Sequence, residues 1–84
     1  MSRIAMPYER IEVECYSGHK ANERPKAIIF QGKRRDVQDI IDRWYEGGRE
    51  ASRPVINYFK VRTKEGQVFI IRYQPLFDAW SIQL

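Results

Sequence analysis

The sequence contains very few of the residues that build disulfides and metal sites. Among its 84 residues there is one cysteine, Cys15, and one histidine, His19. A single cysteine excludes an intrachain disulfide and a cysteine-rich zinc site, and it favours a reducing compartment. No stretch has the spacing of a metal-ligand, phosphate-loop or nucleophile-elbow motif. We therefore expect no catalytic, metal-binding or cofactor-binding residue, and a domain that is not an enzyme.

Long hydrophobic runs are missing as well. The first residues lack the apolar stretch of roughly 7 to 15 residues that marks a secretory signal. No later run reaches the roughly 18 apolar residues of a membrane span. These absences predict a cytoplasmic, bacterial-type location and no membrane partner.

The composition is that of a small globular domain. Hydrophobic residues make up 43% of the chain and aromatic residues 13%, which suffices for a core without disulfides or metal. The length allows one domain, so we predict a single unit spanning 1–84, with 1–7 as a flexible N-terminal segment.

Alternating apolar and polar residues predict strands in two N-terminal segments. In the first, residues 9–16, the side chains of Ile11, Val13 and Cys15 share one face. The second covers residues 26–30 and is followed by Gly32, which suits a tight reversal. Such a hairpin places Arg34 and Arg35 on the returning strand.

The segment 57–74 has the pattern of a hairpin whose register can be predicted. A three-residue turn over residues 64–66, with Gly66 in the left-handed conformation, sets Thr63 opposite Gln67. One face then carries Phe59, Val61, Phe69, Ile71 and Tyr73, and the other carries Tyr58, Lys60, Val68, Ile70, Arg62 and Arg72. After a turn at 75–78, Trp80, Ile82 and Leu84 alternate along a closing strand, and both Trp80 and Trp44 are expected to anchor the core.

Two structures are compatible with residues 37–46. A helix fits because the apolar residues recur at intervals of three and four, Asp36 can cap the first turn and Gly47 can end the last. A strand fits only if a β-bulge near Asp39 and Ile40 shifts the alternation. In a strand without a bulge, Asp36 and Asp42 lie on one face and Asp39 lies on the other. Periodicity alone favours the helix.

A resemblance favours the strand. The residues that carry it lie between about 25 and 84: Phe30, Gly32, Val37, Ile40, Ile41, Asp42, Arg43, Trp44, Glu46, Tyr58, Phe59, Val61, Thr63, Gly66, Tyr73, Asp78 and Trp80. In these the chain resembles a family of small bacterial cytoplasmic domains of unknown function, some encoded near translesion polymerase genes. Arg35 and Asp36 depart from the pattern, which has an aromatic residue just before the valine.

The resemblance implies an SH3-like β-domain with residues 37–46 as a long bent strand, and it supplies no catalytic residue. We therefore predict an all-β fold: a small antiparallel, partly open SH3-like barrel of five to six strands. The alternative is an α+β domain with one helix at 37–46 packed on an antiparallel sheet.

Charge and aromatic residues indicate two hypotheses for function. The net charge is +4, and the candidate partner or nucleic-acid surface comprises Lys26, Lys33, Arg34, Arg35, Tyr58, Lys60, Arg62 and Arg72. The first hypothesis is an adaptor that binds an unknown protein partner, with a role in DNA maintenance implied by the resemblance. The second is single-stranded or non-specific nucleic-acid binding, in which cations contact phosphates and aromatic rings stack on bases.

Overall fold

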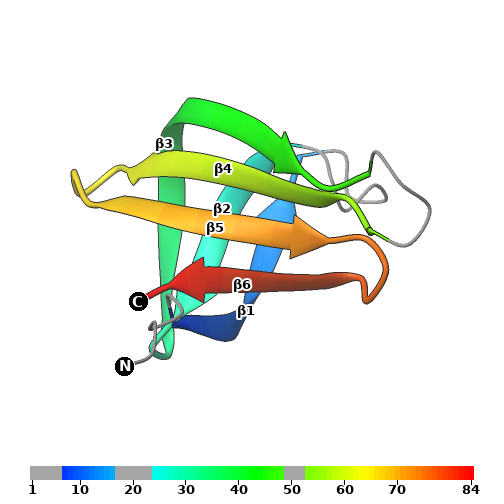
Figure 1. The fold of residues 1–84 in the computed structure, drawn as a ribbon. Coiled ribbons are helices and arrows are strands. Elements are labelled where there is room, and N and C mark those ends of the chain that lie inside the picture. Colours follow the sequence, from blue (N-terminus) through cyan, green and yellow to red (C-terminus); the bar gives the residue numbers. More distant parts are fainter. Residues whose placement is uncertain (1–6, 17–23, 49–52) are drawn as a thin grey trace, which may run out of the picture.

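The computed structural model describes residues 7–16, 24–48 and 53–84, which form a closed barrel of six antiparallel strands (Figure 1). The strands are β1 (Tyr8–Cys15), β2 (Pro25–Phe30), β3 (Lys33–Glu46), β4 (Ile56–Thr63), β5 (Val68–Gln74) and β6 (Ala79–Gln83). They follow one another around the ring in chain order, and pairing of β1 with β6 closes it. The predicted all-β antiparallel barrel is confirmed, with six strands, and the β1–β6 pairing makes the ring closed where a partly open one was predicted. His19 and the start of the chain up to residue 6 lie outside the described residues.

Two strands form the corners of the barrel because each changes partner along its length. β1 pairs with β6 from Tyr8 to Ile11 and with β2 from Glu12 onward. β3 pairs with β2 up to Asp36 and with β4 from Val37 onward. As a result β4, β5 and β6 cross the direction of β2 and the first part of β3 (Figure 1).

β3 is a strand throughout, so the helical alternative for residues 37–46 is wrong. Two β-bulges explain the misleading pattern: Gln38 has no partner between the pairs Val37–Thr63 and Asp39–Arg62, and Ile41 has none between Ile40–Val61 and Asp42–Lys60. Each bulge shifts the alternation by one residue. Asp39 and Asp42 consequently lie on the same face, contrary to the prediction from simple alternation.

The turns follow the predicted chemistry. The amide of Thr63 donates to the carbonyl of Gln67 at 2.8 Å, and Gly66 has a φ of 92°, which confirms the three-residue loop between β4 and β5. The two-residue turn between β2 and β3 places both Gln31 and Gly32 at positive φ, the geometry that matches the twist of a tight hairpin. The register of both hairpins is therefore fixed locally.

The core lies inside the ring and contains most of the predicted inward residues. Buried side chains include Ile11, Ile28, Val61, Ile82, Phe59, Ile71, Tyr73 and Trp80, and Val13, Cys15 and Phe69 pack against them. Trp44 corrects the prediction, because it pairs with Tyr58 and stacks on that ring instead of entering the core. Leu84 follows the end of β6 and is exposed. In the described parts of the chain no helix is long and apolar enough to span a membrane.

Candidate partner-binding surface

The outer face of β4 and β5 gathers half of the predicted surface residues. In the observed register Tyr58 lies opposite Arg72, Lys60 opposite Ile70, and Arg62 opposite Val68. Cross-strand partners point to the same side of a sheet, so these six side chains share one face as predicted. The face has two halves with different properties.

The half nearest the end of β3, here called the closed half, is covered by its own side chains. The indole of Trp44 lies parallel to the ring of Tyr58, with centroids 5.2 Å apart and planes 2° apart. On the neighbouring strand the guanidinium of Arg72 lies 3.7 Å from the ring centroid of Tyr8. These contacts leave Tyr58 only 7% exposed, so its ring faces are not free to stack on a ligand.

Hydrogen bonds hold the closed half in place. The hydroxyl of Tyr58 donates to Glu46 Oε1 at 2.9 Å, and that of Tyr8 donates to Gln83 Oε1 at 3.3 Å. Burial, with the hydrogen bond to Glu46 adding to it, raises the pKa of Tyr58 above its ordinary value. The cluster therefore links five strands, β3, β4, β5, β6 and β1.

The other half, here called the open half, consists of Lys60, Arg62, Val68 and Ile70. Val68 is 47% exposed, and Ile70 is half-buried beside it. Arg62 lies 3.7 Å from Asp39 of β3, an exposed ion pair of small energetic weight. Lys60 has no ion-pair partner within the described residues. The open half thus offers apolar side chains flanked by two cations.

The other four predicted residues, Lys26, Lys33, Arg34 and Arg35, lie apart from this face, along the β2–β3 hairpin. Arg34 pairs with Glu14 at 2.8 Å and with Asp36 at 3.2 Å. The hydrogen bond to Asp36 raises the pKa of the Arg34 guanidinium. Arg34 therefore contacts two carboxylates of the barrel, both in exposed ion pairs.

Lys33 and Arg35 are engaged as well. Lys33 lies 3.2 Å from Glu65. The guanidinium of Arg35 lies over the rings of Phe30 and Phe69, at 5.2 and 5.7 Å from their centroids, and donates to the carbonyl of Phe30 at 3.0 Å. Lys26 is exposed, with its ammonium 6.0 Å from the ring centroid of Tyr16. Four of the eight predicted residues therefore share the β4–β5 face, and the other four have separate contacts along the β2–β3 hairpin.

Sequence reasoning missed three contributors to the outer face. Trp44 is expected in the core because tryptophan is the largest side chain, yet it lies on the outer face over Tyr58. Asp39 reaches Arg62 only because a bulge precedes it. Tyr8 contacts Arg72 across 64 positions of the chain, and no local pattern reports such a contact.

No metal centre is formed in the described ranges: no three His, Cys, Asp or Glu side chains are grouped to hold a metal ion there. No family model, curated protein or solved structure matches the chain. What is established about the kind of protein is therefore its fold, a small six-stranded antiparallel β-barrel.

Proposed function

We propose that the chain is a small, non-catalytic binding module that engages a protein partner through the open half. The observation that carries this proposal is the exposure of Val68 next to Ile70 on β5, beside Lys60 and Arg62 of β4, on a face that no described element covers. Centres of protein interfaces combine apolar side chains with few charges, and arginine is common in them. In the open half, Val68 and Ile70 are the apolar side chains and Arg62 is the arginine, with Lys60 as a second charge beside them.

The engagement of the cations favours protein over nucleic acid. Lys33, Arg34 and Arg62 are paired with carboxylates. Nucleic-acid affinity depends on cations that are free to neutralise phosphates and on ring faces that are free to stack on bases. Arg35 and Arg72 lie on aromatic rings, and Trp44 covers Tyr58. Lys26 is exposed, and the half-buried Lys60 has no ion-pair partner within the described residues.

The proposal also includes the class of the barrel, its cellular location and its biological role. The SH3-like class is supported by the resemblance, through residues such as Phe30, Gly32, Trp44 and Trp80, to SH3-like bacterial domains. A cytoplasmic location rests on the absence of apolar runs in the sequence, and a role in DNA maintenance rests on the resemblance alone.

A pull-down from native bacterial extract with matched variants tests the proposal. Val68→Asp places a charge in the open half, whereas Val55→Asp makes the same change at a residue that is 40% exposed outside it. We expect wild type and Val55→Asp to retain the same partner and Val68→Asp to lose it. Equal recovery by all three proteins would remove the open half as the binding surface.

Nucleic-acid binding is tested separately by fluorescence anisotropy with labelled single- and double-stranded oligonucleotides over a salt series. We expect weak binding that the Lys60→Glu substitution leaves nearly unchanged. Tight binding that weakens steeply with salt and is lost in Lys60→Glu would favour the nucleic-acid hypothesis instead.

A further inference from the structure

The half-buried ring of Trp44, at the margin of the closed half, has one face covered and one face turned outward. The covered face lies on Tyr58, with planes 2° apart and centroids 5.2 Å apart. From Val37 onward β3 pairs only with β4, so no described strand lies beyond Trp44, and Figure 1 shows this part of β3 at the edge of the sheet. Within the described residues no other ring and no cation lies on the indole. Its second face is therefore turned away from the barrel.

Two carboxylates flank Trp44 on the same face of β3. No register shift occurs between Asp42 and Glu46. The side chains at positions 42, 44 and 46 therefore point to the same side of the sheet, because side chains alternate along a strand. Each flanking residue lies roughly 7 Å from Trp44 along the strand. The indole thus has one carboxylate before it and another after it.

Hydrogen bonds hold both carboxylates without neutralising them. Glu46 Oε1 accepts a hydrogen bond from the hydroxyl of Tyr58 at 2.9 Å, and Asp42 Oδ1 accepts one from the amide of Arg43 at 2.8 Å. Each carboxylate keeps its second oxygen for a ligand. Both residues are exposed, and neither forms an ion pair with a cation in the described part of the chain.

The cations nearest to Trp44 in sequence and in register leave its outward face open. The guanidinium of Arg43 lies over the buried ring of Phe59, 4.8 Å from its centroid, and so lies on the inner side of β3. Lys60 is opposite Asp42 on the outer face, and its single charge is smaller than that of the two carboxylates. A chain of net charge +4 thus has a local excess of negative charge beside an uncovered indole face.

An indole face between two carboxylates suits a guanidinium group. The guanidinium is planar and stacks flat on an aromatic ring, and among aromatic residues tryptophan attracts cations most strongly. Its N–H groups point outward in the plane of the group, where carboxylates beside the ring accept them in charge-assisted hydrogen bonds. The ammonium group of lysine is a compact charge with no plane to stack. The arrangement therefore favours arginine over lysine.

We propose that Asp42, Trp44 and Glu46, here called the Trp44 site, bind an arginine side chain of a protein partner. One open ring face and two exposed charges hold a free guanidinium compound only weakly, whereas an arginine carried by a protein gains further contacts from the segment around it. The inference rests on the proposed function in one respect, that the partner is a protein. It uses none of the residues of the open half, so each surface can fail without the other.

The test follows the two indole N–H signals of the full chain by NMR while a peptide of arginines spaced by glycine and serine is added. The Trp44→Phe variant lacks one N–H and so assigns the signal of Trp44. Matched peptides carry lysine, or citrulline, which keeps the planar shape of arginine without its charge. We expect the arginine peptide to shift the Trp44 signal and not that of the buried Trp80, the lysine peptide to bind more weakly, and the citrulline peptide to cause no shift. No shift with arginine, or equal shifts with either matched peptide, would overturn the proposal.

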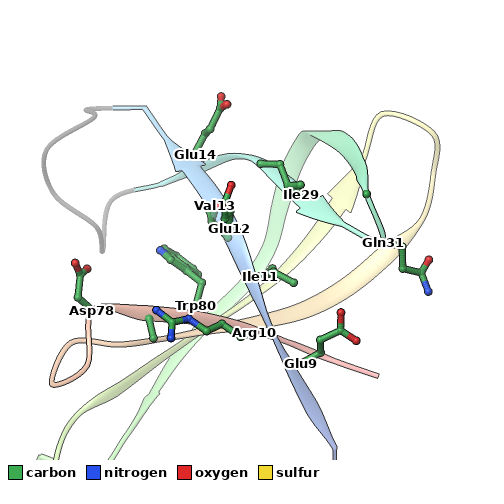
Figure 2. Close-up of a pocket in the computed structure, with 12 residues that line it drawn as sticks. Glu9, Arg10, Ile11, Glu12, Val13, Glu14, Ile29, Gln31, Asp78 and Trp80 are labelled. Carbon is green, nitrogen blue, oxygen red and sulfur yellow. The ribbon is translucent and has the colours of Figure 1, made fainter.

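Charge variants locate the site. Asp42→Asn with Glu46→Gln removes both charges, while each amide keeps an oxygen that can accept the present hydrogen bond. The control is Glu9→Gln with Glu12→Gln, two exposed residues of β1 that Figure 2 shows along a strand whose neighbouring ring, Trp80, is only 7% exposed. We expect the first pair to weaken peptide binding about fivefold, the effect of losing two exposed charge contacts, and the control to bind as wild type does. Equal weakening by both pairs would show attraction to net charge and would remove the Trp44 site.

The Val68→Asp variant separates this proposal from the open half. We expect it to bind the arginine peptide as wild type does, because it leaves the three residues of the Trp44 site unchanged. An arginine peptide that does not bind wild type, together with an extract partner that Val68→Asp loses, would overturn the Trp44 site alone. Peptide binding at Trp44 together with an extract partner that Val68→Asp retains would overturn the open half alone.

Discussion

The indole of Trp44 lies parallel to the ring of Tyr58 across the β3–β4 ladder, with planes 2° apart. The stack shields Tyr58, and we expect Trp44→Ala to lower the free energy of unfolding by about 1 to 3 kcal/mol, the range for losing an aromatic pair together with part of its buried area. Urea denaturation followed by circular dichroism measures this. Trp44→Phe keeps a stacking ring and should retain most of the stability; equal losses in both variants would contradict the role of the stack.

Alkaline pH should destabilise the barrel through Tyr73. Burial, and then the 2.7 Å hydrogen bond from its hydroxyl to Asp78, raise the pKa of Tyr73 to about 12. An unfolded tyrosine ionises near pH ~10, so the folded state holds its proton more tightly than the unfolded state does. This contribution to stability is complete below pH ~10 and is lost as the pH rises toward ~12. The urea midpoint measured across this range should fall.

The Tyr73→Phe variant isolates this effect. It should be less stable than wild type near neutral pH, because Asp78 loses its donor, and its midpoint should fall less between pH ~10 and ~12. Some slope remains because the pKa of Tyr58 is raised as well. Parallel curves for the two proteins would show that Tyr73 does not carry the pH dependence.

Two glycines at positive φ should differ in their tolerance of alanine. Gly32 and Gly47 have φ of 71° and 76°, but a Cβ at Gly32 meets open space, whereas one at Gly47 would collide with the carbonyl oxygen of Pro54. We expect Gly32→Ala to cost about 1 to 2 kcal/mol, the cost of a left-handed residue, and Gly47→Ala to cost clearly more. Chemical denaturation of both variants measures the difference, and equal costs would argue against the close approach at Pro54.

Removal of a bulge residue should be tolerated better than removal of a paired one. Ile41 has no partner in β4, so its deletion leaves the pairs on both sides in register. Deletion of Lys60 shifts every later pair of β4 and turns core side chains outward. We expect the Ile41 deletion to keep a cooperative thermal transition and the Lys60 deletion to abolish it. Cooperative melting of both would contradict the assigned bulges.

The sequence was sufficient to predict the β4–β5 hairpin, because Gly66 and the alternation of apolar residues are local features. It was insufficient for β3. With one extra residue at Gln38 and another at Ile41, the inward Val37 and Ile40 are three residues apart, and the unpaired Ile41 and the outward Trp44 are again three apart. A spacing of three is close to the 3.6-residue period of a helix, so a doubly bulged strand and a short amphipathic helix have nearly the same pattern.

The candidate surface was predictable in part, because the alternation of side chains along a strand is a local feature. Alternation placed Tyr58, Lys60, Arg62 and Arg72 on one face correctly. It could not distinguish compensated cations from free ones, because the partners are distant in sequence: Arg34 meets Glu14 across 20 positions. Whether a cation can serve a ligand depends on such pairs, which only the folded barrel reveals.

The closure of the ring has a consequence for chain connectivity. The amide of Leu84 donates to the carbonyl of Pro7 at 3.0 Å, so the two ends of the barrel meet on adjacent strands. A short linker could join them, and the polypeptide could instead begin at the exposed β4–β5 turn, as in a circular permutant. In such a cyclic order no strand is inherently first or last, and the chain opens at the turn between β4 and β5 instead of between β6 and β1.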